Sequence, residues 1–149
     1  MSMSAQYSHN GVRDDLTHCT APPLFYAHVD RIIAGSLRRD SPFSLIAFTL
    51  SDAATDEDVI ALAHSITLSM RQEDLCGRLG INQFTIALAG DVMAGQELSK
   101  RVRESFGPAV QATVAQYERG ESSLDLFYRL DQLCEKQAKS EARSRAESP

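Results

Sequence analysis

The sequence feature that most restricts the fold is a predominantly apolar run at residues 43–50, FSLIAFTL. A helix that crosses a membrane needs about 20 apolar residues, so this run is far too short to insert into a bilayer. Its shortness and its aromatic content favour a buried strand instead. A chain of 149 residues corresponds to one domain, and it can bury about 70% of its extended surface without metal or disulfide support. We therefore expect one domain with a packed core and no membrane insertion.

Helical and strand patterns alternate along the rest of the chain. Thr55 is a predicted helix N-cap, because Asp56, Glu57 and Asp58 follow it in the first turn, where the helix dipole favours anions. Residues 80–83, GINQ, separate two short strand patterns and indicate a hairpin. The other predicted elements are a first helix over 23–38, strands over 75–79, 83–89 and 109–117, a helix that ends at Gly107-Pro108, and a last helix from Ser123.

The predicted element order is α-β-α-β-β-α-β-α, and its central part is the ferredoxin-like split βαβ arrangement. The fold class is therefore α+β, with an antiparallel sheet of about four strands and the helices packed on one face. Residues 1–13 and 140–149 contain few large apolar side chains, and they are predicted to be flexible tails. The domain itself is expected to span residues 14–139.

Composition excludes several classes of function. The chain has a formal charge of −5, so it lacks the excess of basic residues that is typical of a general nucleic-acid binder. The cysteines form no CxxC pair, which argues against a disulfide framework or a cysteine-based zinc site and suits a reducing cytoplasm. No metal-binding HxxxH or HExxH spacing occurs among the histidines, which are His9, His18, His28 and His64. We expect a cytoplasmic protein without a metal or cofactor.

The segment around the predicted hairpin resembles the centre of the GGDEF family, the diguanylate cyclases of bacterial signalling. That family places an RxxD motif ahead of a GG(D/E)EF turn. Here Arg71 and Asp74 supply the RxxD, and the turn reads Gly80-Ile81-Asn82-Gln83-Phe84. Residues 14–17, DDLT, resemble the opening DxLT motif, and residues 130–143 resemble the closing AD…LY.AK..GR segment. The resemblance therefore covers residues 14 to 143 and implies the GGDEF fold.

Departures from the family pattern imply that cyclase activity is lost. The resemblance implies that metal-binding carboxylates belong at the end of the first strand and in the turn. Thr49 and Ser51 stand at the strand positions, and Asn82 and Gln83 stand in the turn. Hydroxyls and amides do not supply the negative charge that holds Mg²⁺ beside a triphosphate, and branched Ile81 should obstruct the nucleotide. The family's FK..ND..GH segment is also missing, and Asp56 is better explained as an N-terminal helix charge than as a guanine ligand.

The retained RxxD implies a site for cyclic di-GMP, the product that inhibits the family's enzymes. Arginine can grip the edge of guanine or a phosphate with two parallel hydrogen bonds, and a carboxylate can accept from the opposite edge. A second arginine from the following helix usually completes the site, and Arg101 fits better than Arg103. An i,i+3 pair such as Arg71 and Asp74 could equally be a solvated surface ion pair. Arg78 is expected to be a strand-edge charge that points to solvent.

Two functions of different classes follow. The first is a catalytically inactive receptor that binds cyclic di-GMP through Arg71, Asp74 and Arg101, with the ligand expected as an intercalated dimer that could link two chains. The second is a nucleotide-independent docking or dimerisation module, with the helix over 23–38 as its contact element. In both, the partner would be another signalling or secretion-related protein. A residual cyclase is a distant third.

Overall fold

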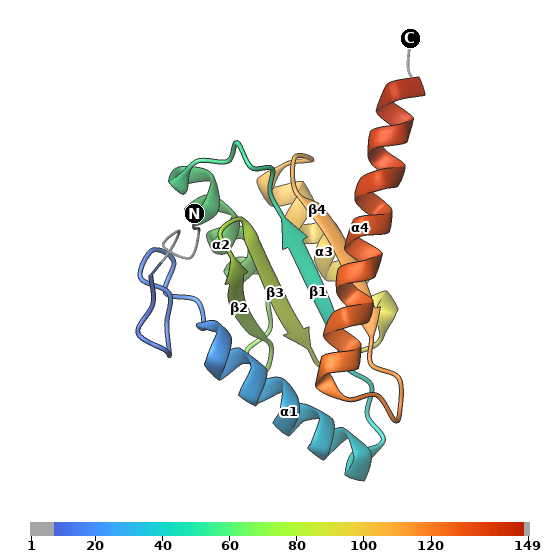
Figure 1. Ribbon diagram of the computed structural model, residues 1–149. Coiled ribbons are helices and arrows are strands. Elements are labelled where there is room, and N and C mark those ends of the chain that lie inside the picture. Colours follow the sequence, from blue (N-terminus) through green and yellow to red (C-terminus); the bar gives the residue numbers. More distant parts are fainter. Residues whose placement is uncertain (1–7, 148–149) are drawn as a thin grey trace.

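The computed structural model describes residues 8–147. They form a four-stranded antiparallel sheet in the order β2-β3-β1-β4, with helices against both faces (Figure 1). The α+β class and the predicted element order are confirmed. In chain order the elements are α1 (Pro22–Arg39), β1 (Ser44–Thr49), α2 (Asp56–Ser69), β2 (Leu75–Gly80), β3 (Gln83–Leu88), α3 (Val92–Phe106), β4 (Gln111–Gln116) and α4 (Ser123–Glu147).

Strand β1 lies inside the sheet, between β3 and β4, and explains why residues 43–50 are apolar almost throughout. Side chains alternate across a strand. Ile46 and Phe48 therefore face one cluster, which includes residues of α2 and α3. Leu45 and Ala47 face a second cluster, which includes residues of α1 and α4. The expectation that the helices share one face is wrong, because α1 and α4 cover the face that the crossover helices α2 and α3 leave open (Figure 1).

The helix ends follow their sequence signals. Thr55 caps α2 as predicted: its hydroxyl accepts a hydrogen bond from Asp58 N at 3.2 Å, and the Asp58 carboxylate accepts one from Thr55 N at 2.9 Å. This reciprocal pair is a capping box, and it satisfies backbone donors that the first turn cannot pair internally. Gly107 ends α3 with a φ of +129°, a conformation that side-chain-bearing residues rarely adopt.

Two segments assigned to tails by the sequence take part in the fold. Of the predicted N-terminal tail, residues 1–7 lie outside the described residues, whereas residues 8–13 belong to a hydrogen-bonded loop in which Ala21 N donates to Val12 O at 2.8 Å. The last helix continues through residues 140–147 rather than ending in a tail. Glu141 on this extension accepts a hydrogen bond from Gln111 Nε2 at 2.6 Å, at the start of β4. The folded unit is thus longer than residues 14–139.

Candidate ligand-binding site

The RxxD motif forms the short connection between α2 and β2. Asp74 is 7% exposed, and its two carboxylate oxygens accept backbone hydrogen bonds. Oδ2 accepts from Arg71 N at 3.0 Å, and Oδ1 accepts from Ala89 N at 3.3 Å, just after β3. Asp74 therefore fixes the backbone of Arg71 and ties this connection to the neighbouring strand. These bonds also occupy part of the capacity with which the carboxylate could accept from guanine.

Two arginines lie near the C-terminal end of α2, where this connection begins. Arg71 is exposed, and within residues 8–147 its guanidinium has no hydrogen bond or ion pair. Arg101 reaches from α3 to the last residue of α2, where its Nη2 donates to Ser69 O at 3.1 Å. Arg103 on the same helix instead lines a groove between α3, β4 and α4. Arg71 and Arg101 thus present planar donors at one corner, a chemistry suited to guanine edges and phosphates.

The turn at residues 80–84 is fastened to the end of β1 through its third residue, Asn82. Asn82 Nδ2 donates to Ser51 O at 2.9 Å, and Leu50 N donates to Asn82 O at 2.9 Å. Ile81 is 38% exposed, while Phe84 is fully buried in the core. Gly80 and Gln83 are partly buried at the ends of the paired strands. The hairpin prediction is confirmed, and the turn's amide serves to hold the backbone.

The residues around this turn do not fit a divalent-metal site. Thr49 pairs with Gln83 across the sheet, so a hydroxyl and an amide meet where the family resemblance implies carboxylates. Within the part of the chain that the structure describes, no group of three or more His, Cys, Asp or Glu side chains is arranged to hold a metal ion. Asp56 is the exposed first residue of α2, beside the Thr55 cap. Hard cations such as Mg²⁺ need carboxylate charge, which these positions lack.

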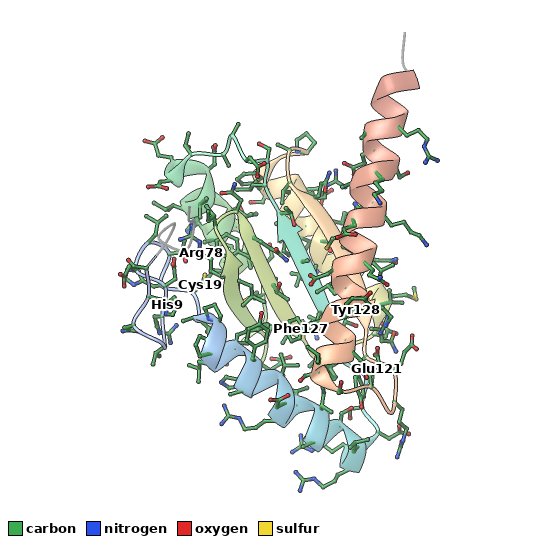
Figure 2. The ribbon with its side chains drawn as sticks, viewed as in Figure 1. His9, Cys19, Arg78, Glu121, Phe127 and Tyr128 are labelled. Atoms are coloured by element: carbon green, nitrogen blue, oxygen red, sulfur yellow. The ribbon has the colours of Figure 1, made fainter. Side chains whose placement is uncertain are left out.

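A buried ion pair beside the turn was not predicted. Arg78, which lies beside the N-terminal loop (Figure 2), is 2% exposed. Its Nη1 donates to both oxygens of Asp14, at 3.0 and 3.1 Å. Its Nη2 donates to Ile81 O at 2.7 Å, so the same guanidinium holds the turn. Asp14 also accepts from Thr17 N and Thr17 Oγ1. The expectation that Arg78 points to solvent is wrong, because the N-terminal loop covers that side of β2 and supplies the charge it needs.

Comparison with known proteins supports the fold. No family model matches the sequence, and no curated protein sequence matches it. Solved GGDEF-domain structures do resemble it. The GGDEF domain of DgcB from Caulobacter crescentus, solved in complex with c-di-GMP, has a TM-score of 0.79 and 15% identity, over 89% of this chain and 93% of that one. The FimX GGDEF domain from Pseudomonas aeruginosa has a TM-score of 0.77 and 14% identity, over 86% and 94%.

A third solved structure is the diguanylate cyclase SiaD from Pseudomonas aeruginosa, in complex with its activator SiaC. It has a TM-score of 0.75 and 20% identity, over 86% of this chain but only 58% of SiaD. At these identities the likeness establishes the GGDEF fold and leaves the activity to be argued from the site. None of the described helices combines the length and the apolar character that crossing a bilayer requires.

Proposed function

We propose that this protein is a catalytically inactive GGDEF-like domain that acts in the cytoplasm as a receptor for cyclic di-GMP. Arg71 and Arg101 would supply the donors to guanine and phosphate. Asp74 would hold the Arg71 backbone in place and offer the remaining capacity of its carboxylate to the ligand. The observation that carries the proposal is that Arg71, which is exposed and has no side-chain hydrogen bond or ion pair among the described residues, lies two residues after Ser69, whose carbonyl accepts from Arg101.

Loss of catalysis is part of the same proposal. Phosphoryl transfer depends on positioning and on metal ions that neutralise developing charge. Thr49, Ser51, Asn82 and Gln83 offer hydroxyls and amides, and Asn82 is already engaged with the Ser51 carbonyl. We therefore expect no conversion of GTP in the presence of Mg²⁺.

A nucleotide-independent docking module is the second candidate, because large apolar side chains are exposed on two helices of the same face. Tyr26 and Leu37 on α1 are 44% and 48% exposed, and Leu124 and Tyr128 on α4 are 78% and 64% exposed. Such side chains are typical of surfaces that bind another protein. One of the similar structures, SiaD, was solved with a protein activator, which makes a signalling protein a reasonable class of partner.

Calorimetric titration with cyclic di-GMP tests the proposal. The wild-type protein should bind in the low micromolar range, about −8 kcal/mol. Arg71→Ala and Arg101→Ala should each weaken binding by roughly tenfold or more, because each removes charge-assisted hydrogen bonds of about 1.5–3 kcal/mol.

Arg103→Ala is the matched control, because it removes the same charge from the same helix but on the side that faces β4 and α4. Its affinity should stay within about twofold of wild type. Equal losses in all three variants would reduce the effect to general electrostatics. If no binding is detected at ~100 µM ligand, the binding free energy is weaker than about −5.5 kcal/mol. The receptor is then excluded and the docking module becomes the better explanation.

A further inference from the structure

Two cysteines that are far apart in sequence lie opposite each other at the edge of β2. Thr20 forms an isolated parallel bridge with Gly77. In this bridge Thr20 N donates to Cys76 O at 3.1 Å, and Arg78 N donates to Thr20 O at 3.0 Å. One residue earlier on both segments, the same register sets Cys19 beside Cys76. Neighbouring strands lie about 5 Å apart, which is inside the Cα separation that a disulfide spans.

The side chains meet as well as the backbones. Cys19 and Cys76 belong to the same core cluster, beside α2 and α3, and they are 8% and 6% exposed. The two thiols are close enough for each to perturb the pKa of the other. Both cysteines are in the free thiol form. The pair therefore needs no change of fold to bring its sulfur atoms together.

The surroundings make the two thiols chemically unequal. The hydrogen bond from Cys76 is the main reason that the pKa of Cys19 is lowered to about 7; the hydroxyl of Thr17 and the charge of Arg78 also lower it, whereas burial and Asp14 oppose them. The same hydrogen bond, together with burial, raises the pKa of Cys76 well above its ordinary value. The thiolate is the reactive form of cysteine. A lowered pKa favours Cys19 as the attacking thiol and leaves Cys76 as the resolving thiol.

We propose that Cys19 and Cys76 form a modification site at which a peroxide-class oxidant makes a reversible intramolecular disulfide. The Cys19 thiolate attacks a peroxide oxygen, which cleaves the O–O bond, gives a sulfenic acid and releases hydroxide. Cys76 sulfur then attacks the sulfenic sulfur, and the sulfenic oxygen leaves as water with the Cys76 proton. In balance, two thiols and one hydrogen peroxide give one disulfide and two waters. A dithiol reductant reverses the reaction by exchange.

The bond would fix the N-terminal loop to β2 covalently. That loop carries Asp14, and β2 carries Arg78, which holds the turn through the Ile81 carbonyl. Oxidation would therefore lock the segment that supports the degenerate turn. The proposed disulfide involves neither Arg71 nor Arg101 and does not depend on cyclic di-GMP binding.

The experiment treats the full chain with hydrogen peroxide under native conditions, followed by thiol counting and mass spectrometry of tryptic peptides. Trypsin separates the three cysteines into peptides 14–31, 72–78 and 130–136. The expected product has lost two hydrogen atoms and two of its three free thiols. Peptides 14–31 and 72–78 should be joined, and dithiothreitol should restore both thiols. Because the wild-type chain is mapped directly, the result does not depend on any variant folding.

Cys134→Ser is the matched control, since Cys134 is half-buried on α4 and its pKa is raised, chiefly by burial. This variant should form the cross-link at the wild-type rate. Cys76→Ala should instead stop at oxidised forms of Cys19 without a cross-link. Oxidation of Cys19 in the wild type without a bond to peptide 72–78, or persistence of all three thiols, would overturn the proposal.

Discussion

At the scale of single residues, the most consequential pair is Asp14 and Arg78. Both side chains are almost fully buried, with exposures of 0% and 2%. A buried charge is tolerated only when it is paired and hydrogen-bonded. Each carboxylate oxygen of Asp14 accepts from Arg78, and Thr17 supplies two further donors. Removal of one partner would leave the other charge in the interior without compensation.

Asp14→Ala should therefore lower the free energy of unfolding by about 3–5 kcal/mol, the usual cost of breaking a buried pair. Urea unfolding followed by circular dichroism measures this change. We expect the urea concentration at the unfolding midpoint to fall. The slope of the unfolding free energy against urea should stay the same, since the surface exposed on unfolding is unchanged.

Arg119→Ala provides the comparison for this prediction. Asp40 pairs with Arg119 at 3.1 Å, but the two side chains are 87% and 67% exposed. Exposed ion pairs contribute under about 1 kcal/mol, so this variant should be nearly neutral. A loss of less than 1 kcal/mol in Asp14→Ala would mean that the buried pair is dispensable.

The position of Arg78 could not be predicted from its neighbours in the sequence. An arginine in a short strand at the edge of a sheet ordinarily points to solvent. Its burial depends on Asp14, which is remote in the sequence and reaches it only because the N-terminal loop folds across β2. Asp14 was assigned to the opening DxLT motif and not to a contact with β2, so the partner was missed as well. Burial of this kind depends on tertiary structure.

At the scale of elements, the close approach of α1 to β2 depends on a residue without a side chain. A Cβ atom at Gly77 would lie 2.6 Å from Phe25 Cδ1 and 2.7 Å from its Cγ. Phe25 is fully buried and anchors α1 to the sheet. Any larger residue at position 77 would have to push the aromatic ring, and the helix with it, away from β2.

Gly77→Ala should consequently destabilise the protein by about 1–3 kcal/mol, the range for overpacking a core. Gly35→Ala on α1 is the control, because no atom lies within 4 Å of the added Cβ. Alanine favours a helix over glycine, so Gly35→Ala should stabilise by roughly 0.5–1 kcal/mol. Thermal unfolding of both variants measures the effect, and a neutral Gly77→Ala would show that α1 can shift freely.

Most elements were predictable to within about two residues, because their periodicity and caps are local signals. Thr55 at the start of α2 and Gly107 at the end of α3 are examples. The exception is the end of α4. Residues 140–149 read as a tail because they lack large apolar side chains, but Glu141 bonds to Gln111 on β4 and the helix runs on to Glu147. A long-range polar contact does not appear in the hydrophobic periodicity of the sequence.

At the scale of the whole molecule, the sheet lies between two cores and contributes residues to both, with β1 among the strands that do so. Phe48 belongs to the cluster with α2 and α3, and Leu45 belongs to the cluster with α1 and α4. Displacement of β1 from one cluster would also remove residues that the other cluster packs against. The two halves should therefore unfold together.

Urea titration followed by two probes tests this cooperativity. The tyrosines among the described residues lie on α1 (Tyr26), on α4 (Tyr128) and directly after β4 (Tyr117). Far-ultraviolet circular dichroism, in contrast, reports all helices. We expect the tyrosine fluorescence and circular dichroism transitions to coincide, as two-state unfolding requires. A fluorescence transition at lower urea would show that α1 and α4 separate first.

The candidate site was predictable only in part. Arg71, Asp74 and Arg101 were found through a family resemblance, and Arg101 does reach the end of α2. The sequence did not indicate that the Asp74 carboxylate accepts from two backbone N–H groups. The bond from Ala89 N depends on the path of β3, which is a tertiary feature. The alternating burial of β1 was implicit in its apolar run, but the sequence pattern did not say which helices cover which face.

The bridge between Thr20 and Gly77 has a consequence for how this sheet meets other chains. Exposed strand edges invite pairing with foreign strands, which leads to aggregation. The bridge occupies backbone groups of Cys76 and Arg78 at the middle of β2, so that edge is blocked by the protein's own loop. On the opposite side, β4 pairs only with β1 among the described strands. A strand that is to extend this sheet must therefore add at β4.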